Sequence, residues 1–175
     1  MKHNIGNLLI SDFPKDFTTR HICFTNTMRK KVNAIMMNQF ASLAKHKKTN
    51  VLELKALEYS ENSQDVKLTA GTPFIARVNR EKMNLFNNQM WIIKQISLKK
   101  ETITIQEEDG EMTMDIANDT VQKLFNPGWC ITCHRSQGST YDHPYTVHEF
   151  DRMDDRLKYV ALSRATAVEH IRVWW

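Results

Sequence analysis

The sequence predicts an α/β fold that is interrupted by a small antiparallel β unit. Near both ends of the 175-residue chain, short apolar strands alternate with segments of helical spacing, whereas residues 71–123 contain only short strand-like runs between polar turns. We therefore expect one α/β domain built from residues 1–70 and 124–175. Residues 71–123 are expected to form a β-rich insert within it.

The composition is that of an ordinary globular domain, with 41% hydrophobic and 25% charged residues. No apolar run approaches the roughly 18 residues that a membrane span needs, and the first residues lack the apolar core of a secretory signal. We therefore expect an intracellular protein without a membrane partner. The net charge of +4 permits a polyanionic partner but does not specify one.

The first elements of the α/β part are a strand and a helix. Residues His21–Thr25 form a short run of β-forming residues, and Asn26 opens a segment with apolar side chains at helical spacing. We expect these side chains to pack in the core: Met28, Val32, Ile35, Met36 and Phe40. The basic run Lys45–Lys48 is interpreted as a solvated helix end, with phosphate contact as the alternative.

The remaining elements follow in chain order. The insert is expected to contain four strand-like runs: Thr72–Asn79, Met90–Ser97, Glu101–Gln106 and Glu111–Ile116. The α/β part then resumes with a strand at Trp129–Thr132 and a polar loop that reaches Thr140. A further strand, a helix and a last strand are expected at Tyr145–Phe150, Arg156–Thr166 and Ile171–Trp175. The tryptophans are expected in core or end packing, with base stacking as the alternative: Trp91, Trp129, Trp174 and Trp175.

Cys130, Cys133 and His134 have the C-x-x-C-H spacing that attaches a c-type haem covalently. A strand would direct the two thiols to opposite faces of a sheet, where they could not coordinate the same metal ion. By residue type alone, His143 and His148 could complete a set of zinc ligands, but the chain has no second C-x-x-C pair. We expect free, buried thiols with no haem and no zinc, and a redox or metal protein remains an alternative.

The loop after this strand is rich in hydroxyl, amide and cationic donors around one glycine, which suits phosphate oxygens. Its polar residues are Thr132, His134, Arg135, Ser136, Gln137, Ser139 and Thr140, with Gly138 among them. The sequence therefore predicts phosphate binding at this loop.

Two segments, Thr132–Asp142 and Lys158–Thr166, resemble motifs V and VI of superfamily 1 helicases, especially of the RecD-like and Dda-like branch. Cys23–Asn33 resembles motif IV of the same family. Leu68–Arg80, with Asn87–Ile96, is similar to the segment that links those motifs. The resemblance implies a RecA-like parallel sheet flanked by helices, the second of two motor domains (2A), with an antiparallel insert that includes an SH3-like 2B element.

The function implied by this resemblance is that of the C-terminal motor domain of an ATP-dependent DNA helicase acting in replication or repair. Such a protein moves 5′ to 3′ on single-stranded DNA and unwinds duplex. Arg164 matches the motif VI arginine that acts as a catalytic finger on ATP, and a guanidinium suits developing phosphoryl charge. The other residues expected at the nucleotide are Arg29, Gln137 and Gly138. Those expected at the DNA backbone are Asn26, Thr132, His134, Ser136 and Ser139.

The nucleotide-binding half of such a motor is not found in this sequence. No G-x-x-x-x-G-K-[ST] loop occurs among the five glycines, and no acidic strand-end motif precedes the matched region. We therefore expect a piece of a longer polypeptide whose N-terminal RecA-like domain binds ATP and Mg²⁺, and we expect this piece to be inactive alone. The alternative is a stand-alone, non-catalytic module that binds single-stranded nucleic acid.

Overall fold

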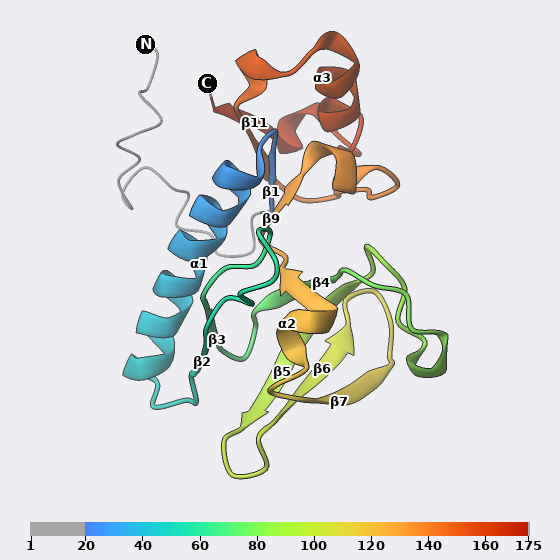
Figure 1. The fold of residues 1–175 in the computed structure, drawn as a ribbon. Coiled ribbons are helices and arrows are strands. Elements are labelled where there is room, and N and C mark those ends of the chain that lie inside the picture. The colour runs from blue at the N-terminus through green and yellow to red at the C-terminus, as the bar shows by residue number, and fades with distance from the viewer. Residues whose placement is uncertain (1–19, 175) are drawn as a thin grey trace. The chain divides into compact units, whose positions relative to one another are not determined.

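The computed structural model describes residues 20–174, so the start of the expected motor domain and Trp175 lie outside the described residues. The chain divides into two compact units (Figure 1). Unit 1 comprises Met1–Ile35 and Cys130–Trp175, and unit 2 comprises Met36–Trp129. Within residues 20–174, no helix has both the length and the apolar character to cross a membrane.

Unit 1 is built on a four-stranded parallel sheet with the strand order β11-β10-β1-β9. Its strands are β1 (Arg20–Cys23), β9 (Cys130–Thr132), β10 (Tyr145–His148) and β11 (Ile171–Trp174). Every residue of β1, β9 and β10 is buried, as expected for parallel strands that are covered on both faces.

Helix α3 and the first part of α1, up to Ile35, belong to unit 1, and both helices begin at side-chain caps. Helix α1 runs Asn26–His46, and its first turn is capped by Thr25, whose hydroxyl accepts a hydrogen bond from the Met28 amide at 3.2 Å. Helix α3 runs Asp155–Leu162 and is capped by Asp154, which accepts from the Leu157 amide at 2.7 Å. Short 3-10 turns complete the unit: η4 (Cys133–Ser136), η5 (Phe150–Arg152) and η6 (Val168–His170).

One face of the parallel sheet packs against α3 through an apolar cluster. Ile22, Tyr145 and Val147 from the strands meet Ala161 of α3 in this cluster. The Tyr145 hydroxyl donates to the Ala161 carbonyl at 2.6 Å, and burial raises the pKa of this phenol to about 12. These contacts fix α3, and with it the segment that carries Arg164, against β10.

Unit 2 contains a five-stranded antiparallel sheet with the order β7-β6-β5-β4-β8. Its strands are β4 (Pro73–Ala76), β5 (Met90–Ser97), β6 (Thr102–Glu107), β7 (Thr113–Ala117) and β8 (Phe125–Pro127). The other elements of the unit are the pair β2 (Leu52–Leu54) and β3 (Val66–Leu68), the turn η3 (Glu81–Met83) and the helix α2 (Val121–Leu124).

Strand β5 shows why apolar alternation is interrupted in this unit. Trp91 and Ile93 are fully buried, but the next buried residue is Ile96. The register with β6 shifts between Ile93 and Gln95, so a bulge inserts an extra residue and returns the inward face to Ile96. Ile103 and Ile105 of β6 are also fully buried and pair with Ile96 and Ile93.

The strands and helices expected from the sequence are all present within the described residues. Of the expected core positions of α1, Met28, Val32 and Met36 are buried and confirmed, whereas Ile35 and Phe40 are half-buried. Trp91 and Trp129 are fully buried, which confirms their packing role. Strands β2, β3 and β8 and helix α2 were not expected. Because β8 pairs with β4, the antiparallel sheet continues past residue 123, where the expected insert ends. An SH3-like 2B element stays a prediction.

Candidate functional site

The carboxyl ends of the parallel strands gather several of the predicted site residues at one edge of the sheet. Asn26 follows β1, His134 follows β9, and Glu149 follows β10. Ligands of open α/β sheets bind at this edge, because the loops after parallel strands converge there. Asn26 and His134 are both exposed.

The loop after β9 presents its polar residues unequally. Gln137 and Gly138 are exposed and Ser139 is half-buried, whereas Thr132 is largely buried. Ser136 is fully buried, and its hydroxyl donates to the Cys133 carbonyl at 2.8 Å. A contact between Ser136 and a DNA phosphate would therefore require that hydroxyl to leave the Cys133 carbonyl.

Gly138 has a φ of +88°, in the left-handed region that glycine adopts freely. No heavy atom lies within 4 Å of the position that a Cβ would take there. The loop therefore requires glycine at this position for its backbone conformation and not for lack of space.

Arg164 follows α3, and its guanidinium reaches the same loop. Its Nη1 donates to the Ser139 carbonyl at 3.2 Å, and its Nε donates to the Val160 carbonyl at 3.0 Å. The backbone segments are also joined, because the Tyr141 amide donates to the Arg164 carbonyl at 2.8 Å. The structure thus joins the predicted finger to Ser139, which follows Gln137 and Gly138 in the same loop, although Arg164 is far from this loop in the sequence.

The charge of Arg164 is not neutralised by a carboxylate among residues 20–174. Its remaining hydrogen bond goes from Nη2 to the Ser163 hydroxyl at 3.0 Å, so its acceptors are all neutral oxygens. The residue is half-buried, which leaves part of the guanidinium accessible. A cation held by neutral acceptors at an accessible loop can take an anionic oxygen as a further partner.

Asn26 and Arg29 form a pair at the start of α1. The Arg29 Nε donates to Asn26 Oδ1 at 2.9 Å. Asn26 is exposed, but Arg29 is only 3% exposed. The nucleotide contact expected of Arg29 would therefore require its guanidinium to become accessible.

Glu149 is a site neighbour that the sequence did not reveal. It is only 3% exposed, and its carboxylate accepts from the Thr25 amide at 2.8 Å and from the Thr25 hydroxyl at 3.0 Å. Arg152 Nη1 donates to the same carboxylate at 2.6 Å. No motif marks Glu149, since an acidic residue after a strand is ordinary in sequence and acquires these partners only through the fold.

Asn33 is a second residue that the sequence did not single out. Its side-chain amide donates to the Cys130 carbonyl at 2.9 Å, and its oxygen accepts from the Cys130 amide at 3.0 Å. Because β9 is an edge strand, this fully buried side chain satisfies backbone groups that no neighbouring strand pairs. It attaches α1 to the strand that leads into the loop.

Cys130 and Cys133 lie on opposite sides of the sheet, as expected. The reason differs from the expected one, because Cys133 is not part of the strand. Strand β9 ends at Thr132, and Cys133 begins η4 and joins the apolar cluster with Ile22. The Cys133 thiol donates to the Leu157 carbonyl at 3.3 Å. Burial raises the pKa of both thiols, so they are protonated at neutral pH.

No cluster of three or more His, Cys, Asp or Glu residues arranged to hold a metal ion occurs in the described part of the chain. His148, one of the residues considered for a zinc set, has its ring within hydrogen-bond distance of His21.

No protein-family model matches the chain, and no curated protein matches it. Solved structures of Pif1 helicases do resemble it. The chain superposes with a TM-score of 0.69 and 22% identity on a structure of DNA unwinding at forked double-stranded DNA by two coordinating Pif1 helicases. That match covers 92% of this chain and 40% of the other.

Two structures from Bacteroides give similar values. Pif1 bound to single-stranded DNA matches with a TM-score of 0.68 and 20% identity, over 92% of this chain and 41% of that one. Pif1 in complex with ADP-AlF3 and single-stranded DNA matches with a TM-score of 0.64 and 22% identity, again over 92% and 41%. The chain spans about 40% of the length of these helicases. It therefore has the fold of part of a Pif1 helicase, with a four-stranded parallel sheet and additional antiparallel sheets.

Proposed function

We propose that this chain is the C-terminal motor domain of an ATP-dependent DNA helicase that moves 5′ to 3′ on single-stranded DNA and unwinds duplex inside the cell. The fold it shares with part of the Pif1 helicases supports this proposal, as do the single-stranded DNA and the ADP-AlF3 that those helicases bind. The single observation that carries it is the position of Arg164, which among residues 20–174 donates only to neutral oxygens and reaches the Ser139 carbonyl in the loop of Gln137 and Gly138.

Arg164 and its loop fit one edge of a polyphosphate. A guanidinium with neutral acceptors can turn its donors to phosphate oxygens without breaking an ion pair. ATP, bound with Mg²⁺, would supply the phosphoryl group whose transfer drives the motor. Arg164 would stabilise the negative charge that develops on this phosphoryl group. The exposed Gln137 and Gly138 would lie where the phosphates approach Arg164.

An N-terminal RecA-like domain of the same polypeptide would hold most of the nucleotide and the metal ion. In this proposal the residues that hold the ion belong to that domain, because the G-x-x-x-x-G-K-[ST] loop and the acidic strand-end motif are not found in this sequence. On its own, this chain would not hydrolyse ATP.

Single-stranded DNA would lie along the sheet edge that carries Asn26 and His134. Both side chains are exposed there, and both can donate hydrogen bonds to phosphate oxygens. Contacts to the backbone hold a strand without reading its sequence, which suits translocation. Thr132 and Ser139 would contribute from less exposed positions, and Ser136 only after its hydroxyl is released.

The test is Arg164→Ala in the full-length protein, with DNA-stimulated ATP hydrolysis and DNA affinity measured separately. We expect turnover to fall by about 10³-fold, because arginine fingers contribute on this scale, and we expect affinity for single-stranded DNA to stay within about twofold. Arg164→Lys should restore little, since an ammonium lacks the planar fork.

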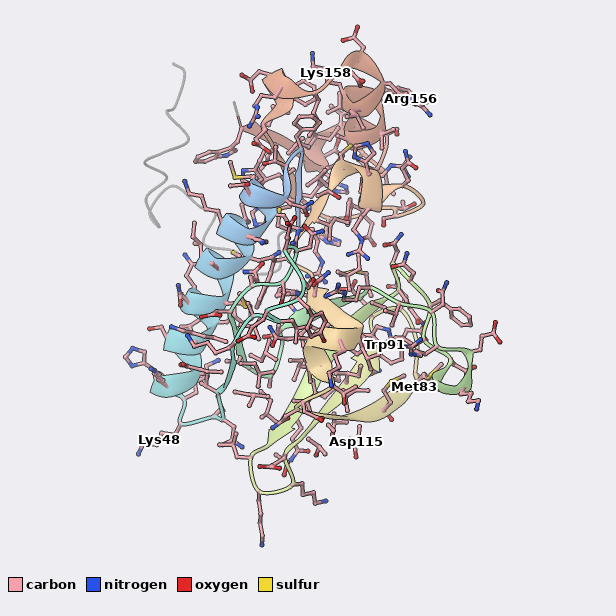
Figure 2. All side chains as sticks on the ribbon, in the orientation of Figure 1. Lys48, Met83, Trp91, Asp115, Arg156 and Lys158 are labelled. Carbon is pink, nitrogen blue, oxygen red and sulfur yellow. The ribbon has the colours of Figure 1, made fainter. Side chains whose placement is uncertain are left out.

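Arg156→Ala is the matched control. Arg156 is an exposed arginine on α3, the helix that precedes Arg164, and its side chain extends from that helix (Figure 2). It should leave ATP turnover unchanged. Undiminished turnover in Arg164→Ala, or an equal loss in Arg156→Ala, would remove the finger assignment.

A further inference from the structure

The β1–α1 junction and the β10–η5 junction are fastened together by one buried carboxylate. Glu149 receives the backbone amide and the hydroxyl of Thr25, and it also receives Nη1 of Arg152. Arg152 extends the junction, since its guanidinium carbon lies 5.9 Å from the centre of the Phe24 ring. These partners belong to two segments that are more than one hundred residues apart in the sequence.

The backbone at Glu149 indicates that this arrangement is imposed by its surroundings. Its φ is +57° and its ψ is +34°, in the left-handed region that residues with a side chain seldom adopt. Such a conformation persists only where the surrounding contacts over-determine it. Here the contacts are the charge-assisted hydrogen bonds to Thr25 and Arg152.

The carboxylate fixes the first turn of α1 through Thr25. The Thr25 hydroxyl donates to Glu149 and at the same time accepts from the Met28 amide, so one side chain joins the carboxylate to the helix cap. The negative charge of Glu149 also lies near the positive end of the helix dipole. Without the carboxylate, the capping residue Thr25 would lose its hydrogen bonds to Glu149, and the position of the next residue, Asn26, would no longer be fixed through it.

The orientation of the Asn26 side-chain amide follows from its hydrogen bond with Arg29. Arg29 Nε–H can only donate, so the atom it meets at 2.9 Å must be the amide oxygen of Asn26. The NH₂ group of Asn26 is therefore at the opposite side of that amide, on an exposed residue at the carboxyl edge of the sheet. Both of its donors are available to an anionic oxygen.

We propose that Glu149 is a positioning residue, which holds the start of α1 so that the Asn26 amide donates to a phosphate of single-stranded DNA. This proposal rests on the proposed function, since it assigns a support to one of its DNA contacts. Glu149 does not touch the DNA itself. It acts through Thr25, and its loss should weaken DNA binding only as far as Asn26 contributes to that binding.

The experiment measures the affinity of the full-length protein for a fluorescently labelled oligo(dT) strand without nucleotide. Asn26→Ala should weaken binding by about 10-fold, the usual size for a hydrogen bond to a charged group. Glu149→Ala should weaken it by a similar factor. In the Asn26→Ala background, Glu149→Ala should add less than about twofold, because the contact that it positions is already absent.

Two further variants complete the design. Thr25→Val keeps the shape of the side chain and the backbone amide but removes the hydroxyl that donates to Glu149. It therefore tests the same contact through the other partner if Glu149→Ala does not fold. Asp151→Ala removes an exposed acidic residue two positions from Glu149 and should leave the affinity unchanged.

The outcomes separate the two proposals. Equal losses from Glu149→Ala, or from Thr25→Val, in the presence and absence of Asn26 would show a general structural effect and overturn the positioning role. Unchanged affinity in both variants would overturn it as well. A wild-type protein that binds no oligo(dT) would overturn the DNA-binding function and this inference together.

Discussion

The imidazole rings of His21 and His148 meet inside unit 1, with Nδ1 of His21 3.0 Å from Nε2 of His148. The two residues lie on the neighbouring strands β1 and β10 and are at most 2% exposed. Burial lowers the pKa of His148 to about 4. It also lowers the pKa of His21, where the nearby His148 and Arg20 act in the same direction. Both rings are therefore neutral at pH 7, so one donates and the other accepts.

This pair predicts loss of stability in mild acid. In the unfolded chain the histidines titrate near 6.5, so between pH 6.5 and about 4 the unfolded state binds more protons than the folded state. The contribution of His148 to the free energy of unfolding is fully present above pH 6.5 and is lost as the pH falls to about 4. This loss amounts to on the order of 3 kcal/mol.

Urea unfolding at a series of pH values measures this effect. His148→Gln should unfold more easily at pH 8 but should lose less stability than the wild type between pH 6.5 and 4. His46→Gln, which changes an exposed histidine at the end of α1, should keep the wild-type pH dependence. Identical slopes for His148→Gln and the wild type would mean that the pair does not govern acid stability.

Asn33→Ala should destabilise unit 1 by about 2–4 kcal/mol, because it leaves the buried amide and carbonyl of Cys130 without partners. Thermal or urea unfolding checks this value. Asn38→Ala, at an exposed position of the same helix, should be neutral or slightly stabilising, since alanine has the higher helix propensity. Comparable effects of the two substitutions would show that the Asn33 contacts contribute little.

Gly138→Val should cost about 1–2 kcal/mol of stability or displace the loop, because a β-branched residue disfavours the φ of +88°. Gly138→Asn should be tolerated better, since asparagine enters the left-handed region more readily. The open space around the position means that side-chain size alone should not matter. Limited proteolysis of the loop and urea unfolding should rank the variants as wild type, Asn, then Val. Equal behaviour of Asn and Val would contradict this backbone explanation.

The three thiols of the chain should resist modification in the folded protein. Cys23, Cys130 and Cys133 are all buried, and burial raises the pKa of Cys130 and Cys133. Titration with a thiol reagent at pH 8 should therefore give a slow reaction in buffer and three fast equivalents in guanidinium chloride. Ser42→Cys, at an exposed position of α1, should add one fast equivalent to the folded protein. Rapid labelling of native thiols in the wild type would contradict the buried arrangement.

Local sequence patterns determined most of the secondary structure of this protein. The run of β-forming residues before Asn26 and the apolar spacing after it specify β1 and α1, because both periodicities are local properties. The antiparallel strands of unit 2 were predictable for the same reason. Strands β2, β3 and β8 were missed, since each has only three residues and is stabilised by its pairing partner.

The tertiary structure alone decided which of these residues act together. The resemblance to helicase motifs selected Arg164, Gln137 and Gly138, but Arg164 reaches their loop, at the Ser139 carbonyl, only in the folded chain, where Tyr141 pairs with Ala165. The partners of Glu149 and Asn33 lie 124 and 97 residues away, and no local pattern encodes such distances. A sequence can specify its strands and helices through short-range preferences, whereas a buried carboxylate acquires its role only when chain folding brings donors to it.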